Sequence, residues 1–264
     1  MNRFPLRPRS LVWLLVFLLV IPAFAAMDED FGVPDEAAFP NAEELLDSVV
    51  TSLPAVPVNV EARIISKTLR GEIDRKLNAE MLLDWYGPQP FARYTVRDAF
   101  GETLEELQIV RPAGPAREIR YLRGDPPQES ELPDLYERIE GTDISWIDLS
   151  LAYLWWPGGT TVGAEPVKGR FCYIVDLPAP EGDKGEYEGV RLWIDAQINI
   201  LLQAAAYDSG GQLVKLLEVK SFKKIGDVWI IQNLDVQSFP KRHKTSLRVR
   251  GADVIERMEL PGGS

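Results

Sequence analysis

Short segments that alternate between apolar and polar residues fill most of this chain, and turn residues such as glycine and proline separate them. The alternation is clearest at 58–64 and 79–86. A period of two places successive side chains on opposite faces of a β-strand, so these segments predict strands with one buried face. Further segments that predict strands occupy 91–97, 103–110, 116–123, 166–177, 189–195, 199–207, 212–223, 228–238 and 244–250.

The order of these segments predicts a large antiparallel sheet. No helix-length pattern separates the C-terminal segments, and the turns at 208–211 and 226–227 contain glycine, which supplies the positive φ of tight hairpins. An open sheet of about ten strands tends to curl, split or close, and a barrel wider than about eight strands can hold a cavity. We therefore predict a mainly β (α+β) domain built on one large antiparallel, curved sheet.

One amphipathic helix is predicted at 41–53. Asn41 can cap its first turn, Glu44 follows as in a capping box, and Pro54 ends it. A helix with a single apolar face packs against an apolar surface, so this helix can act as a plug or lid for the sheet. Its expected lid residues are Leu45, Leu46, Val49 and Val50.

The connections between strands are polar or aromatic. Residues 125–140 predict a polar loop with a short helical turn. Residues 146–149 predict a short helix, followed by an apolar segment to Trp156 and a Gly-Gly loop.

The N-terminus has the order of a secretory signal peptide. Residues 1–10 carry three arginines and no acid, 11–21 are an unbroken apolar run, and an Ala-x-Ala spacing ends at Ala25. The apolar run is shorter than the ~20 residues that a membrane span requires. We expect cleavage after Ala25 or Ala26 and export to the periplasm, without a cysteine for lipid attachment.

Cleavage would leave an acidic mature chain. Residues 26–40 predict a loose acidic leader, and 41–264 predict a single domain. Without the signal peptide the chain carries 26 basic and 40 acidic residues, a formal charge of −14. This charge argues against nucleic acid as a partner and against docking on an anionic membrane through charge alone. Cys172 is the only cysteine, and its apolar neighbours predict a buried, inert thiol.

Candidate catalytic groups are sparse. The single histidine, His243, lies in a basic turn where a solvated side chain is expected, and a Ser-His-Asp or Cys-His arrangement would have to use it. The sequence has no histidine cluster for zinc and no phosphate-binding glycine loop before a helix. Asp143, Asp148 and Asp176 could supply a hydrolase carboxylate pair, but 40 acidic residues produce such sets by chance. We expect no enzyme activity, no cofactor and no metal.

Aromatic and aliphatic residues are the strongest functional signal. Six tryptophans lie outside the signal peptide, and Trp155 and Trp156 are adjacent, so in a strand their rings would face opposite sides. Two interpretations remain open. The surplus can fill a large core, or it can line an apolar pocket for a lipid chain, which is the usual composition of a ligand cavity.

A series of motifs covers about 110 residues, from 141 to 250. In their order and spacing these motifs resemble the exported outer-membrane lipoprotein-sorting proteins of Gram-negative bacteria, the LolA-like superfamily, and most closely an uncharacterised branch of it. Residues 56–123 resemble that family only in strand pattern. The motifs are GTDISW at 141–146, DL at 148–149, GRFCY at 169–173, VRLWID at 190–195, YD and GG at 207–211, KKIG at 223–226 ahead of Trp229, and TSL at 245–247.

The resemblance implies a half-open, incomplete β-barrel with helices over its mouth. Such a monomeric carrier holds the acyl chains of a lipoprotein, or another lipid, and crosses the periplasm between an inner-membrane donor complex and an outer-membrane acceptor. The alternative is a periplasmic sensor or regulatory binding module with this fold and no transport role. Residues expected to contribute to the cavity or its mouth are Met81, Leu83, Trp85, Trp155, Trp156, Tyr173 and Trp193.

Overall fold

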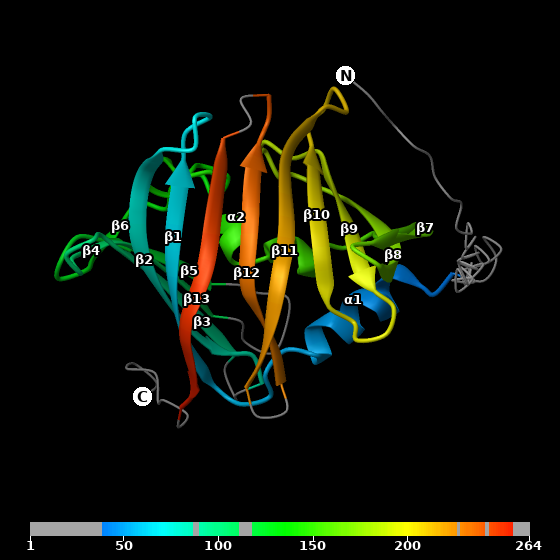
Figure 1. Cartoon of the computed structure of the whole chain (residues 1–264), viewed down its shortest axis with the longest axis horizontal. Helices are drawn as coiled ribbons and strands as arrows, with labels where there is room; N and C mark the ends of the chain where they lie inside the picture. The colour runs from blue at the N-terminus through cyan, green and yellow to red at the C-terminus, as the bar shows by residue number, and fades with distance from the viewer. Residues whose placement is uncertain (1–38, 87–89, 111–117, 226–227, 241–242, 256–264) are drawn as a thin grey trace, which may run out of the picture. The chain divides into compact units, whose positions relative to one another are not determined.

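The structure, a computed structural model, describes residues 39–86, 90–110, 118–225, 228–240 and 243–255 (Figure 1). These residues belong to one compact unit. The predicted signal peptide, most of the leader, and the turns at 226–227 and 241–242 lie outside the described residues.

The described strands form one antiparallel sheet, in the order β6-β5-β4-β3-β2-β1-β13-β12-β11-β10-β9-β8-β7. Strands that follow one another in the chain pair with each other, apart from β6 and β7. Strand β1 also pairs with β13, and this pairing joins the two halves of the sheet. The strands are β1 (Val58–Lys67), β2 (Ile73–Asp84), β3 (Phe91–Arg97), β4 (Thr103–Val110), β5 (Glu118–Arg123), β6 (Gln128–Ser130), β7 (Thr160–Val167), β8 (Arg170–Pro178), β9 (Gly189–Asp195), β10 (Leu201–Tyr207), β11 (Leu213–Ile225), β12 (Val228–Ser238) and β13 (Lys244–Val254).

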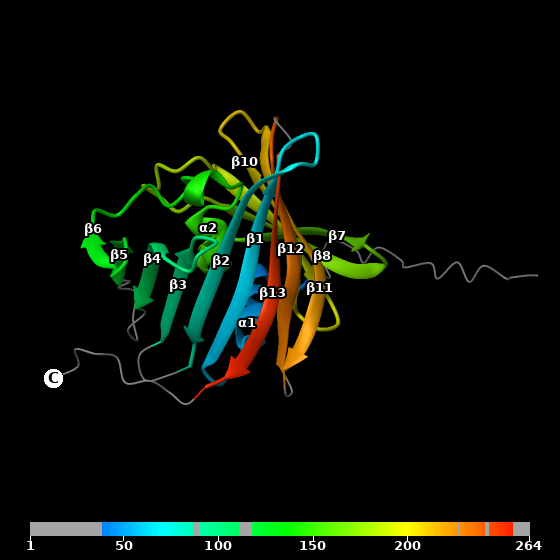
Figure 2. The ribbon, with the colours of Figure 1, turned by 60° about the vertical axis from the view of Figure 1, so that its left-hand side comes forward.

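The sheet is strongly curved but does not close. Strands β6 and β7 are its two edges and do not pair with each other, and the views in Figures 1 and 2 show the strands wrapping around the helical segments. The predicted fold class, a large half-open antiparallel barrel, is therefore confirmed. The helical segments on its concave side are α1 (Ala42–Thr51), α2 (Trp146–Leu149) and the 3₁₀ turns η2 (Ile139–Gly141) and η3 (Ala152–Trp155). None of the described helices has the length and apolar character that a membrane span requires.

Two strands differ from the prediction for identifiable reasons. The strand predicted at 166–177 is divided by a turn at Lys168 and Gly169, and the residues before this turn belong to β7. Strand β7 begins at Thr160, inside the expected Gly-Gly loop, because its sequence TTVGAEPV lacks apolar alternation. It is an edge strand, where Pro166 is tolerated. Strand β6 is a short, exposed edge in the segment that predicted a helical turn.

The sheet has a core on each face. The main core fills the concave side and includes the apolar faces of α1, α2 and η3. A smaller cluster lies on the outer face and consists of Cys172, Trp193, Leu202 and Ala205. The end of the β7–β8 hairpin helps to cover it, since Val167 packs against this cluster and the Lys168 Nζ donates to the Val219 carbonyl at 2.9 Å.

The burial of Cys172 leads to a first testable expectation. Its thiol is fully buried, and burial together with the nearby Asp195 charge raises its pKa to about 11. At pH 8 only about one thiol in a thousand would then be the reactive thiolate. We expect iodoacetamide to leave the native protein unlabelled and to label it fully in urea, as read by intact mass. Rapid labelling of the native protein would contradict the buried placement.

Candidate apolar cavity

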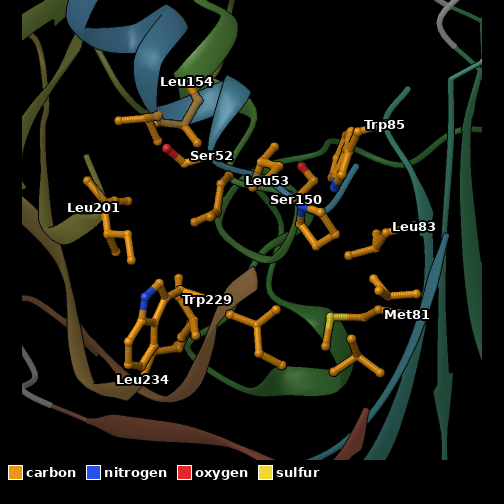
Figure 3. A pocket seen from close by; sticks show the side chains of 18 of the residues that line it. Ser52, Leu53, Met81, Leu83, Trp85, Ser150, Leu154, Leu201, Trp229 and Leu234 are labelled. Carbon is orange, nitrogen blue, oxygen red and sulfur yellow. The ribbon is translucent and has the colours of Figure 1, made fainter. Parts of the chain in front are cut away.

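An apolar cavity lies between the concave face of the sheet and the helical segments (Figure 3). The space open to the centres of water-sized groups is about 160 Å³. Met81, Leu83 and Trp85 face Leu201, Trp229 and Leu234 across it. Its lining consists of Val49, Ser52, Leu53, Pro54, Val58, Val60, Met81, Leu83, Trp85, Tyr94, Leu149, Ser150, Leu151, Leu154, Trp155, Asn199, Ile200, Leu201, Phe222, Trp229, Ile230, Ile231, Leu234, Leu247 and Val249.

No charged side chain belongs to that lining. The polar members are few, notably Ser52 at the end of α1, Ser150 after α2 and Asn199 before β10. Ser52 is exposed and Asn199 is half-buried, and the aromatic lining residue Trp229 is 45% exposed. Such a lining disfavours charged ligand groups inside the cavity, because a buried charge without a partner is costly.

Helix α1 closes part of the cavity from the side. The Asn41 side chain accepts hydrogen bonds from the backbone amides of Glu43 (2.8 Å) and Glu44 (3.4 Å), which fixes the first turn. At the other end Tyr86 Oη donates to the Val50 carbonyl at 2.7 Å. Near the start of α1, a Cβ at Gly159 would lie 3.3 Å from that of Ala42 and 2.9 Å from Leu177 Cδ2, so the Gly-Gly loop permits this close approach.

The four expected lid residues have different positions. Leu45, Leu46 and Val49 are buried in the main core, and of these only Val49 lines the cavity. Val50 is half-buried on the flank of the helix, where its carbonyl accepts from Tyr86. The chain beyond the helix, at Ser52, Leu53 and Pro54, contributes more to the cavity wall than the helix itself.

The segment from α2 to η3 forms the opposite cover. A capping box starts α2, because Ser145 caps the Asp148 amide and the Asp148 carboxylate accepts from the Ser145 amide. Leu151 then adopts a left-handed conformation with φ 50°, which turns the chain into η3. This turn presents Leu149, Leu154 and Trp155 to the cavity. Trp155 stacks on Trp85 of the chain after β2, with ring centroids 5.3 Å apart.

A buried ion pair anchors this segment to the sheet. Lys215 Nζ of β11 donates to Asp148 Oδ2 at 2.8 Å, and the two side chains are only 5% and 4% exposed. Ser145 Oγ donates to the same oxygen at 2.7 Å, and Tyr187 Oη donates to Asp148 Oδ1 at 3.1 Å. Burial and the Asp148 charge raise the pKa of Tyr187 well above its ordinary value, so its hydroxyl remains a donor.

The expected cavity residues separate into two groups. Met81, Leu83, Trp85 and Trp155 line the cavity together. The other three lie elsewhere. Trp156 packs edge-to-face on Tyr153 in the main core, and Tyr173 is half-buried beside Phe171. Trp193 belongs to the outer cluster, where its Nε1 donates to Glu165 Oε1 at 2.6 Å.

The sequence interpretation missed the wall that the C-terminal half supplies. Leu247 and Val249 follow the alternation of β13 and could have been found from it. The remaining wall residues are Leu201, Phe222, Trp229, Ile230, Ile231 and Leu234. Register shifts between Val219 and Phe222 disturb the alternation there, so the inward-facing residues of β11 and β12 could not be assigned by counting.

The three aspartates considered for a hydrolase are each held by a cation. Asp143 accepts from Thr245 Oγ1 at 2.8 Å and lies 3.7 Å from Arg138. Asp176 pairs with Arg191 through two hydrogen bonds of 2.6 and 2.8 Å, and Asp148 pairs with Lys215. None of the three lines the apolar cavity. Across the described ranges, no three His, Cys, Asp or Glu side chains gather as a possible metal site.

A polar cleft of about 390 Å³ also adjoins α2, through Trp146. Trp146, Tyr121 and Glu105 are among its lining residues, with Arg75, Arg123 and Glu140 around them. Tyr121 Oη donates to Glu105 at 2.7 Å, and burial raises the pKa of that carboxyl group. Its mixed charges contrast with the uncharged lining of the cavity.

The fold and the cavity together define a class: an open antiparallel barrel that encloses an apolar chamber beneath a helical cover. A family model described as an uncharacterized protein matches residues 131–259. No curated protein matches the sequence.

Three solved structures have the same architecture as this chain. A DUF1329 family protein from Desulfovibrio piger has a TM-score of 0.69 at 15% identity, over 82% of this chain and 93% of that one. An outer membrane lipoprotein-sorting protein domain from Vibrio parahaemolyticus has a TM-score of 0.69 at 14% identity, over 82% and 93%. A LolA superfamily protein from Nitrosomonas europaea has a TM-score of 0.63 at 14% identity, over 83% and 96%. The chain therefore has a LolA-like fold.

Proposed function

We propose that this protein binds acyl chains of a lipoprotein or another lipid in the apolar cavity and carries them through the periplasm. The observation that supports this most is the cavity lining, which is apolar apart from a few neutral polar groups. Each methylene group that leaves water for such an environment gains about 0.8 kcal/mol. Binding and release of this kind require no covalent chemistry.

The cover segments fit a carrier that must load and unload. The wall at Ser52 to Pro54 belongs to a loop after α1, and the α2–η3 segment is joined to the sheet by side chains and not by strand pairing. The loop contacts at Ser52 to Pro54 can separate locally at lower free energy than the sheet itself, whereas the buried Lys215–Asp148 pair holds the α2–η3 segment in place. A donor complex in the inner membrane and an acceptor at the outer membrane would be the partners of this cycle.

Tryptophan fluorescence gives a direct test, because Trp85, Trp155 and Trp229 lie in the cavity wall. The mature chain would be titrated with cis-parinaric acid, whose absorption overlaps tryptophan emission. We expect saturable energy transfer with a micromolar dissociation constant, reversed by an unlabelled fatty acid. Transfer of the probe between two vesicle populations should rise in proportion to protein concentration. The absence of saturable binding would refute lipid binding, and binding without accelerated transfer would refute the carrier role.

A further inference from the structure

We propose that the end of the barrel at which the cavity meets solvent is a docking surface for a lipid bilayer with anionic head groups, and that the β11–β12 hairpin makes the first contact. The inference goes beyond the proposed binding of a lipid chain, because it assigns a membrane-contact surface to the rim of the cavity. It is carried by the strand pairing of the hairpin, by the exposed apolar side chains around it and by the distribution of charge.

The hairpin end, residues 219–225 and 228–232, is paired only with itself among the described strands. The pairing of β11 with β10 ends at Glu218, and the pairing of β12 with β13 begins only at Asn233. Figure 1 shows the two strands side by side at this end, and two register shifts in β11 lie just beyond Glu218. Since a bulge bends a strand and a two-stranded ribbon is only marginally stable alone, the hairpin end can tilt relative to the rest of the sheet.

Trp229 lies in the hairpin end, where the cavity meets solvent. It belongs to the cavity lining, as Phe222 and Ile231 of the same hairpin do, and yet it is 45% exposed. A ring with an apolar body and a polar N–H is the kind of side chain that gathers at membrane–water interfaces. Insertion of this ring into a bilayer would bring the rim of the cavity to the level of the head groups.

Further apolar side chains are exposed at the same end of the barrel. Strands β1 and β12 are both antiparallel to β13, so their first residues lie at the same end. Val56 lies just before β1, Tyr86 just after β2 and Val254 at the end of β13, and they are 42%, 42% and 54% exposed. The first residue of β1 pairs with Val254 and also with β2 near its end, so the three are neighbours. Together with Trp229 they provide apolar groups that a bilayer can bury.

The hairpin is positively charged in an otherwise acidic protein. Lys223 and Lys224 stand opposite Ile230 and Trp229 in the register of the two strands. Residues 219–234 contain three lysines and one aspartate, which gives a formal charge of +2, whereas the chain without its signal peptide carries −14. Each lysine near an anionic surface strengthens membrane binding by about fivefold. Since charges more than about 8 Å from the contact are largely screened at physiological salt, the local lysines outweigh the net charge.

The charges at the neighbouring strand ends favour contact through the hairpin. Glu61 on β1 and Asp253 on β13 are exposed and acidic, and the exposed Arg250 offsets one of them. The exposed residues in the first turn of α1 are also acidic. An anionic bilayer would attract the lysines of the hairpin and repel these acidic groups, which tilts the protein toward β11 and β12.

Vesicle flotation tests this docking surface. The mature protein would be mixed with vesicles of phosphatidylcholine alone, or of phosphatidylcholine with about 30% phosphatidylglycerol, at about 50 mM and about 500 mM salt. At low salt we expect the anionic vesicles to bind the protein at least about tenfold more strongly than the neutral ones, and most of this difference should disappear at high salt. Lipids brominated on their acyl chains should quench the tryptophan emission of the parent more than that of Trp229→Phe.

Two variants address the surface itself. Trp229→Ala removes the exposed ring, and the double variant Lys223→Gln with Lys224→Gln removes two positive charges. Each should weaken binding to the anionic vesicles about tenfold or more. The lysine variant leaves the apolar lining intact, so it keeps the test decisive if Trp229→Ala proves unstable in urea unfolding.

Matched controls lie toward the opposite end of the sheet. Phe100 is 92% exposed on the β3–β4 turn, and Phe100→Ala removes an aromatic ring from a region outside the cavity lining. Lys67 and Lys76 are exposed on β1 and β2, and the double variant Lys67→Gln with Lys76→Gln removes the same number of charges as the hairpin variant. Both controls should bind the anionic vesicles as the parent does.

Each contrary result has a defined meaning. The absence of binding to both kinds of vesicle would overturn the docking surface. Equal binding to neutral and anionic vesicles would also overturn it, as would equal losses in the two lysine variants or an unchanged affinity of Trp229→Ala. The titration with cis-parinaric acid contains no vesicles, so failure there would refute the proposed lipid binding and leave the docking surface standing.

Discussion

Replacement of Lys215 by methionine is expected to lower the free energy of unfolding by about 3–5 kcal/mol. The reason is the position of its partner. Asp148 of α2 is buried, and Lys215 Nζ, at 2.8 Å, is its only cationic partner among the described ion pairs. Without the lysine the carboxylate remains in the core with hydrogen bonds from Ser145 and Tyr187 but no counter-charge. A substitution that leaves a buried charge without a counter-charge is among the most destabilising that a domain can undergo.

Urea unfolding followed by tryptophan fluorescence measures this effect. Lys220→Met is the matched control, because Lys220 is partly exposed, pairs with Glu218 at 2.7 Å and should cost about 1 kcal/mol or less. The double variant Asp148→Asn with Lys215→Met removes both charges and should recover much of the loss. A Lys215→Met protein within 1 kcal/mol of the parent would contradict the anchoring role.

The second large effect is expected from a charge inside the cavity. Leu83→Glu places a carboxylate on the apolar wall opposite Leu201 and Leu234, where no lining residue carries a positive charge. A bound acyl chain would have to cover that carboxylate, at a cost of several kcal/mol. Since each 1.4 kcal/mol is tenfold in affinity, binding of a fatty acid should weaken by at least about 100-fold.

Leu216→Glu provides the matched control for this change. Leu216 is also a half-buried leucine on a strand, but it packs against the outer cluster with Cys172 and Trp193. The two variants should lose similar amounts of stability, whereas only Leu83→Glu should lose affinity in the parinaric acid titration. Equal affinity of both variants would place the lipid elsewhere on the protein.

The architecture could be predicted from the sequence because apolar and polar residues alternate along strands of the sheet. On β2 the residues Met81 and Leu83 could be placed on one face by counting in twos, and the structure puts both in the cavity. The same alternation holds on β9. Val190, Leu192 and Ile194 form the inner face there, so Trp193 falls on the other side of the sheet.

Other parts of the site depend on features that have no local signal. A strand would have placed the rings of Trp155 and Trp156 on opposite sides. Instead a 3₁₀ turn ends between them, so one ring reaches the cavity while the other packs in the core. The bulges between Val219 and Phe222 decide which residues of β11 and β12 face inward. The pairing of Lys215 with Asp148 joins residues 67 positions apart and appears only when the strands are in place.

The most direct test of the central claim is to identify what the exported protein contains. The mature chain would be purified from the periplasm without detergent and studied by native mass spectrometry, and its bound species would be extracted into organic solvent. The account predicts a mass increment from a bound lipid, present in the Leu216→Glu protein and lost in Leu83→Glu. A clean apo mass that stays unchanged after incubation with fatty acids, lysolipids and lipopeptides would contradict it.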